Sequence, residues 1–138
     1  MKISIPALSL ALGAINGLLA VTLGALGAHR LRDALEAAGL FSAWETAVHY
    51  QMFHALGLIA VVAATAGLRL PLAPIMGCWV GGSLLFSGSI YGLCLGGPSW
   101  LGPVTPVGGV LLLIGWALLL AGALRAIKAS PPGATGKR

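Results

Sequence analysis

Hydrophobic residues follow one another along this chain in four long runs, at residues 5–28, 44–67, 72–96 and 104–124, with short polar breaks between them. A helix needs about 20 residues to cross the ~30 Å hydrocarbon layer of a bilayer, and each run is long enough. The runs predict an all-α protein, an integral membrane four-helix transmembrane bundle within residues 1–128. The first run is longer than the core of a signal peptide, so we expect it to be retained as a span.

The break between the first two runs, residues 29–43, is the only substantial polar segment. Its apolar residues recur at helical spacing, at Leu31, Ala34, Leu35 and Ala38. This pattern predicts a short interfacial amphipathic helix at the membrane surface, ended by Gly39. Ser42 and Glu45 then have the spacing of a capping box at the start of the second span.

Composition supports a membrane class, because 58% of the residues are hydrophobic and only 8% are charged. A soluble domain has about a quarter of its residues charged, so a soluble enzyme is excluded. The eight basic residues form no patch with interleaved aromatic residues, which excludes a nucleic-acid partner. Trp44 and Tyr50 fit the aromatic belt at the lipid–water boundary.

The distribution of basic residues predicts the orientation of the chain. With four spans, both termini and the second loop share one side, and that side carries six of the eight basic residues: Lys2, Arg69, Arg125, Lys128, Lys137 and Arg138. Basic residues are retained on the cytoplasmic side. We therefore expect both termini in the cytoplasm and a disordered cytoplasmic tail over residues 129–138.

Small residues in the first and third runs recur at spacings that let helix backbones approach closely. The predicted helix-packing glycines are Gly13, Gly17, Gly24, Gly77, Gly81, Gly88, Gly92 and Gly96. The third run carries most of them and is expected to lie centrally, whereas the bulkier fourth run is expected at the lipid-facing periphery. Asn16, near the middle of the first run, must find a partner and is predicted to be buried in the bundle.

All three histidines, His29, His49 and His54, fall near the same face of the membrane. Three interpretations are open: a metal or haem site, a proton or ion path, and a hydrogen-bonded packing cluster. No ligand spacing as specific as HExxH occurs, which favours the packing cluster.

Four short motifs resemble one known family: LGALGAH at 23–29, YQMFH at 50–54, LFSGSIY at 85–91 and TPVGG at 105–109. This is the domain of unknown function 423 family, the YgdD-like small inner-membrane proteins. The resemblance implies four membrane helices and no established reaction. It also implies a bacterial inner (plasma) membrane and recurrent polar positions at His29, Tyr50, Gln51, His54, Ser87, Ser89, Tyr91 and Thr105. On the predicted topology these positions suggest one polar patch near the outer membrane face. His49 lies outside these motifs, which leaves His29 and His54 as the better pair.

From these features we expect a non-enzymatic structural or accessory membrane protein that needs no cofactor. Its expected partners are the lipid bilayer and either copies of itself or a larger membrane complex. The alternatives are a small transporter or channel that uses the polar patch, and a haem- or metal-binding membrane protein.

Overall fold

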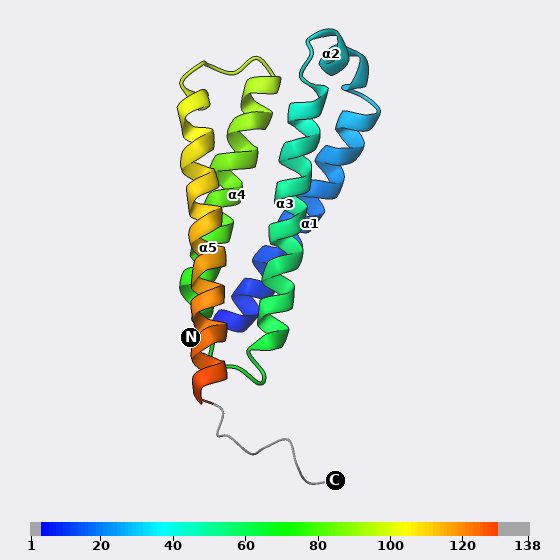
Figure 1. Cartoon of the computed structure of the whole chain (residues 1–138). Coiled ribbons are helices and arrows are strands. Elements are labelled where there is room, and N and C mark those ends of the chain that lie inside the picture. Colours follow the sequence, from blue (N-terminus) through cyan, green and yellow to red (C-terminus); the bar gives the residue numbers. More distant parts are fainter. Residues whose placement is uncertain (1–3, 130–138) are drawn as a thin grey trace.

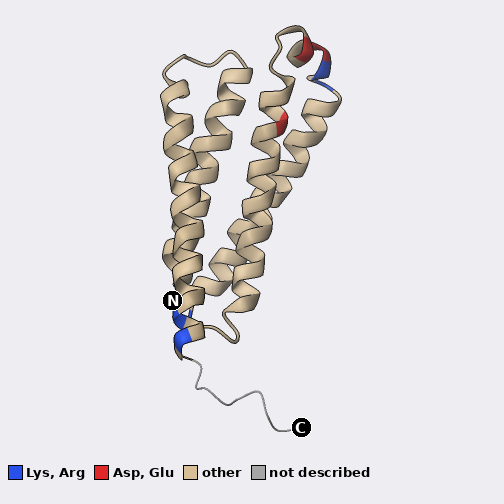
Figure 2. Cartoon of the chain, in the orientation of Figure 1, with Lys and Arg blue, Asp and Glu red and all other residues tan. Residues whose placement is uncertain are grey.

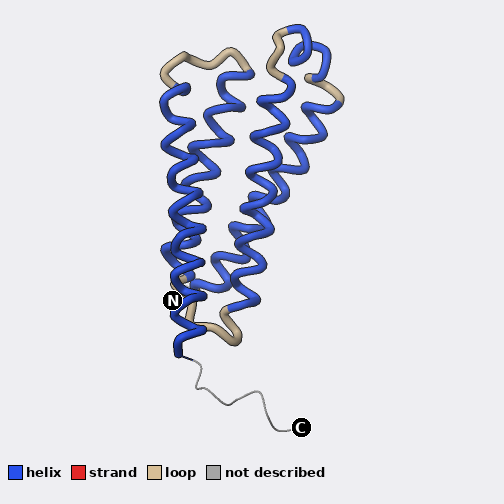
Figure 3. The backbone as a smooth tube through the Cα atoms, viewed as in Figure 1, coloured by secondary structure: helices blue, strands red, loops and turns tan. Residues whose placement is uncertain are grey.

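In the computed structural model, residues 4–129 are described, and they form five α-helices and no strand (Figure 3). The helices are α1 (Ile5–Ala28), α2 (Arg32–Ala37), α3 (Phe41–Ala64), α4 (Leu72–Cys94) and α5 (Leu101–Ala129). All but α2 are long and apolar enough to cross a membrane. Large apolar side chains cover their outward faces, among them Leu18, Leu113 and Ile127. The predicted all-α membrane bundle is confirmed.

The four long helices stand as two antiparallel pairs, α1 beside α3 and α4 beside α5 (Figure 1). The two pairs meet mainly where α3 contacts α4, and α1 also contacts α4. The short helix α2 lies over the ends of α1 and α3, as predicted for the polar break. Because α4 contacts α1, α3 and α5, it occupies the central place that its small residues predicted.

The turn from α2 into α3 corrects the predicted start of the second span. Gly39 has a φ of 68°, its N–H donates to the Glu36 carbonyl, and the Leu40 N–H donates to the Leu35 carbonyl at 2.8 Å. This is a Schellman motif, which ends α2 at the predicted glycine. It reverses the chain so tightly that α3 begins at Phe41, three residues earlier than expected. The Ser42–Glu45 capping box was therefore wrong: Leu40 is the N-cap, and no side chain caps this helix.

Four further helix boundaries differ from the hydrophobic runs by a few residues, whereas α1 keeps its predicted bounds. α3 ends at Ala64, because residues 65–68 close into a hydrogen-bonded turn. α4 ends at Cys94, where Gly96, with a φ of 81°, forms a second Schellman motif. α5 begins before the expected residue 104, because Pro103 lies in a first turn that needs no N–H. It continues to Ala129, and the rest of the predicted disordered tail lies outside the described residues.

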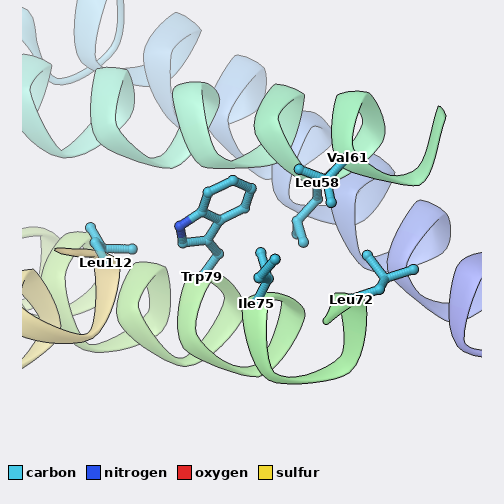
Figure 4. Close-up of a cluster of buried hydrophobic side chains, with 6 residues drawn as sticks. All are labelled: Leu58, Val61, Leu72, Ile75, Trp79 and Leu112. Atoms are coloured by element: carbon cyan, nitrogen blue, oxygen red, sulfur yellow. The ribbon is translucent and has the colours of Figure 1, made fainter. Parts of the chain in front are cut away.

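Two buried clusters fill the bundle at different depths. One contains Leu58, Val61, Leu72, Ile75, Trp79 and Leu112, and it joins α3 to α4 near the turn between those helices (Figure 4). The other lies toward the opposite end, beneath α2, and contains Leu35, Trp44, Ala47 and Tyr91.

The two ends of the bundle differ in charge (Figure 2). All three acidic residues of the chain, Asp33, Glu36 and Glu45, lie at the end where α2 is found, together with Arg30 and Arg32. We call this the α2 end. Arg69, Arg125 and Lys128 lie at the opposite end, which has no acidic side chain and is called the basic end below.

Candidate functional site: the interhelical polar network

A chain of hydrogen bonds crosses three of the spans in the interior. The Gln51 side-chain amide of α3 donates to Asn16 Oδ1 of α1 at 3.3 Å, and Tyr91 of α4 donates its hydroxyl to Gln51 Oε1 at 3.0 Å. The Asn16 amide also donates to the Leu12 carbonyl one turn earlier in α1. All three side chains are more than 90% buried. A buried amide in hydrocarbon must find partners, and here each amide finds its partner on another span.

Trp44 holds this chain in place from the α2 end. Its ring centroid lies 4.7 Å from that of Tyr91, and its indole N–H donates to the Leu23 carbonyl of α1 at 2.9 Å. The ring fits because a glycine faces it: a Cβ added at Gly27 would overlap the indole. Trp44 is only 1% exposed, so its predicted place in the aromatic belt was wrong. Burial of a tryptophan is favourable here because its single donor is satisfied by a backbone carbonyl.

Two serines of α4 make the next contacts between helices. Ser87 donates its hydroxyl to the Ala47 carbonyl of α3 at 2.8 Å. Ser89 lies on the α5 side, where its hydroxyl is 2.7 Å from that of Thr105. These bonds join α4 to α3 and to α5 through hydroxyl groups that are buried between the helices.

His54 makes a separate contact, between α3 and α5. Its Nδ1 lies 2.7 Å from the Tyr50 carbonyl, and its Nε2 lies 3.0 Å from Nε1 of Trp116. A carbonyl can only accept and an indole N–H can only donate. Nδ1 therefore carries the proton, Nε2 accepts, and the imidazole is neutral. Both nitrogens are engaged, so this ring has no free lone pair for a metal or a haem iron.

Six of the eight predicted patch residues make side-chain hydrogen bonds, but they do so in separate groups. Gln51 and Tyr91 share one chain of bonds, Ser89 and Thr105 form a pair, and Ser87 and His54 bond to other elements. The prediction of a single patch was therefore too simple. A hydrogen bond joins only atoms that are close together, so each group is bonded to the helix nearest to it.

The side chains of His29 and Tyr50 take no part in these hydrogen bonds, although the Tyr50 carbonyl accepts from His54. His29 is exposed at the C-terminal cap of α1, and its side chain makes none of the contacts described above. Tyr50 is 43% exposed, and its ring stacks on Phe86 at 4.7 Å, as expected for a residue of the aromatic belt. His49 is also exposed and lines a small cavity of about 160 Å³ between α1 and α3. Within residues 4–129, no three His, Cys, Asp or Glu side chains lie close enough together to hold a metal ion.

The predicted helix-packing glycines fall into two groups. An added Cβ would touch another helix, or a residue flanking it, at Gly13, Gly17, Gly24, Gly81 and Gly92. At Gly77 and Gly88 it would meet nothing within 4 Å, so these residues pack against no other helix of the same chain. Gly96 meets nothing either, and its function is to end α4.

Several of the tightest glycine contacts lie outside the predicted set. Trp79 of α4, fully buried, lies between Gly57 of α3 and Gly115 of α5. Gly108 and Gly82 make the other close contacts between α4 and α5. Gly108, Gly115 and Gly122 are seven residues apart, a repeat that places all three on one helix face. The predominance of leucine in this run obscured that signal, and one face of α5 is packed although the rest faces outward.

A family model described as "Protein of unknown function (DUF423)" matches residues 23–109. This chain belongs to the DUF423 family. The match confirms the resemblance carried by the four motifs.

Curated relatives of this DUF423 protein are described as UPF0382 membrane proteins. One from Staphylococcus saprophyticus is 41% identical over 121 residues, which cover 83% of this chain and 94% of the relative. One from Schizosaccharomyces pombe is 44% identical over 119 residues, covering 78% and 93%. One from Bacillus subtilis is 42% identical over 116 residues, covering 83% and 94%. No solved structure matches the chain.

The DUF423 segment contains most of the polar network but not all of it. Gln51, His54 and Tyr91 lie within residues 23–109, whereas Asn16 and Trp116 lie on either side of that range. Each is bonded to a side chain of the segment, at Gln51 and His54. The first and last spans are therefore attached to the matched segment by polar bonds as well as by packing.

Proposed function

We propose that this DUF423 protein is a non-enzymatic accessory protein of the membrane, and that the outward face of α4 binds a transmembrane helix of another protein chain. The observation that carries this proposal is the pair of open glycines on α4. Gly77 and Gly88 are eleven residues apart, which is almost exactly three helical turns, so they share one face. Gly81 and the exposed Leu84 lie between them on the same face.

This face differs from the other outward surfaces of the bundle. Leu18 of α1 and Leu113 and Leu120 of α5 are each at least 60% exposed, and large apolar side chains of this kind are suited to contact with acyl chains. Glycines leave a shallow depression in a helix, which fits another helix more closely than it fits lipid. Tight helix contact is therefore the chemistry that this surface favours.

The interior of the bundle supports a structural role rather than a chemical one. Its amides, its tyrosine and His54 are bonded to one another and to backbone carbonyls across the spans. A transport path or a haem site would need some of these groups to be free. Their mutual bonding weighs against both alternatives and favours a bundle that acts through its surface.

The experiment compares the size of the protein in native membranes with that of a variant. The chain with Gly77→Leu and Gly88→Leu is solubilised in a mild detergent and its mass is measured by native electrophoresis and native mass spectrometry. We expect the original chain to run as a complex much larger than its own 13.9 kDa, and the variant to run as a monomer.

A matched control places two leucines on another outward surface, Ala14→Leu and Ala25→Leu of α1, both exposed positions. This control is expected to keep the complex. A solitary monomer from native membranes, or equal behaviour of the two variants, would contradict the proposal.

The same proposal includes an orientation, with both termini in the cytoplasm of a plasma membrane. The basic end carries Arg69, Arg125 and Lys128 without an acidic side chain, whereas the α2 end mixes both signs of charge. Basic residues near span ends are retained inside. A cysteine placed at the C-terminus should react with an impermeant maleimide only after the cells are opened, and labelling of intact cells would reverse the orientation.

A further inference from the structure

At the basic end, an open groove of about 530 Å³ lies where all four long helices begin or end. The start of α1, the turn from α3 to α4 and the end of α5 form its walls. Apolar side chains such as Ile5 and Leu68 line part of it, and two arginines, Arg69 and Arg125, line the rest. The groove therefore combines a hydrophobic wall with two positive charges at the end of the hydrocarbon-spanning segments.

Within residues 4–129 neither arginine has an acidic partner, because the one ion pair there is Arg32 with Glu36, at the α2 end. All three acidic side chains of the chain lie at that distant end (Figure 2). A guanidinium has five N–H donors in a planar fork that matches the oxygens of a phosphate. Two such groups without partners in one groove are complementary to an anion.

The packing of α5 explains why the two arginines line the same groove. Gly122 lies against Leu70 and Pro71, where an added Cβ would come within 2.9 Å of the proline ring. Arg125 follows one turn later on α5, and Arg69 is the neighbour of Leu70 in the turn. The close contact at Gly122 thus brings the last turns of α5 against the turn that carries Arg69.

The backbone at this end favours an anion only weakly. α1 and α4 begin here, and neither has a side-chain cap for its first N–H groups. α3 and α5 end here, and their carbonyl ends carry the opposite partial charge. The two arginines, with no acid nearby, therefore determine the sign of the groove.

We propose that this groove binds the headgroup of an anionic phospholipid from the surrounding leaflet, with the phosphate between Arg69 and Arg125 and an acyl chain along the apolar wall. Basic pockets between membrane helices are suited to such headgroups. A free phosphate ion shares the same charge chemistry, but it has no acyl chain to pack against the hydrophobic wall. The inference does not depend on the accessory role or on the open face of α4.

The test measures lipid binding to the full chain in a neutral detergent by native mass spectrometry. Phosphatidylglycerol and phosphatidylcholine are titrated separately, and inorganic phosphate is added as a third arm. We expect phosphatidylglycerol to bind at least about tenfold more tightly than phosphatidylcholine, and Arg69→Gln with Arg125→Gln to weaken its binding about 30-fold, since each basic group near a membrane surface contributes roughly fivefold.

A control variant removes two positive charges elsewhere. Lys128→Gln lies on the same end but outside the groove, and Arg30→Gln lies at the α2 end. This pair should leave phosphatidylglycerol binding within about twofold of the original chain. Arg69→Lys with Arg125→Lys should recover part of the affinity, because the charge returns without the bidentate geometry. Circular dichroism checks that each variant is folded.

Four results would overturn the proposal: equal affinity for the two lipids, unchanged phosphatidylglycerol binding in the folded Gln variant, equal loss in the control variant, or no recovery with lysine. Displacement of the lipid by inorganic phosphate at millimolar concentration would also overturn it, because the site would then recognise a small anion. If the Gln variant does not fold, the lysine variant and the comparison of the two lipids still test the proposal.

Discussion

α4 is joined to α5 and to α3 by two different kinds of contact, although both neighbours lie antiparallel to it in the same bundle. Toward α5, the glycines Gly82, Gly108 and Gly115 allow a close approach, in which Gly108 lies against the backbone of Leu85 and Phe86. We call this the glycine interface. Toward α3, Tyr91 bonds to Gln51 and Ser87 bonds to the Ala47 carbonyl. We call this the polar interface.

The difference reflects what a bilayer leaves available for holding helices together. Lipid tails are as apolar as leucine, so burying leucine between helices gains little in hydrocarbon. Helices then associate by close packing, which needs small residues, or by hydrogen bonds, which need buried polar residues. The α4–α5 pair relies mainly on the first means, with the Ser89–Thr105 bond beside it, and the second is prominent where α3 meets α4. Trp79 packs in both contacts, since it lies between Gly115 of α5 and Gly57 of α3.

The largest expected effect comes from the glycine interface. In Gly108→Ala, the new methyl group would overlap the Phe86 backbone nitrogen and lie 2.8 Å from the Leu85 carbonyl carbon. Backbone atoms cannot rotate away as a side-chain tip can, so α4 and α5 must separate along their contact. We expect the free energy of unfolding to fall by about 3 kcal/mol or more. Unfolding by sodium dodecyl sulfate, followed by circular dichroism, measures it.

Gly88→Ala is the matched control, since it adds the same methyl group to α4 where nothing lies within 4 Å. Alanine favours a helix over glycine by up to about 1 kcal/mol, so this variant should be unchanged or slightly more stable. If both substitutions destabilised the bundle equally, close approach at Gly108 would not be what holds α4 to α5.

The fold and the polar interface could be read from residue type, whereas the glycine interface could not. An amide such as Gln51 or Asn16 in an apolar run must turn inward wherever the neighbouring helices lie, so its burial follows from the sequence alone. A glycine carries no such signal. Gly77 and Gly115 are identical in chemistry, and only the arrangement of the helices leaves one outside and buries the other against Trp79.

The partners of the polar residues were harder to predict than their burial. His54 pairs with Trp116, a residue 62 positions away on the last span. Tryptophan in a membrane protein is usually a boundary residue, which concealed Trp44 as a donor, and Trp116 lies in the bulky run that was expected at the periphery. His29 illustrates the opposite error, because its position near His54 in the predicted topology suggested a pair, yet it lies exposed at the end of α1. A hydrogen bond needs a separation near 3 Å, and sequence spacing does not give that accuracy between helices.

A smaller effect is expected from the polar interface. Gln51→Leu keeps a side chain of similar size and removes two bonds between spans, those to Asn16 and Tyr91. Interhelical hydrogen bonds in membranes contribute about 0.6 kcal/mol each on average and at most about 1.7 kcal/mol. We expect a loss of about 1–2 kcal/mol in the same unfolding measurement, well below that of Gly108→Ala. A loss larger than that of Gly108→Ala would reverse the ranking of the two interfaces.

Tyr91→Phe sharpens this result because it removes one bond and keeps the ring against Trp44. It should cost about 0.6 kcal/mol. In the double variant with Gln51→Leu, the shared bond is lost only once, so the combined loss should be smaller than the sum of the single losses by about the energy of that bond. Strict additivity would mean that the 3.0 Å bond contributes nothing, and that Gln51 stabilises α3 against α1 alone. The α3–α4 contact would then depend on the Ser87–Ala47 bond and on Trp79 with its hydrophobic neighbours, so that packing would contribute more than side-chain pairs in both interfaces.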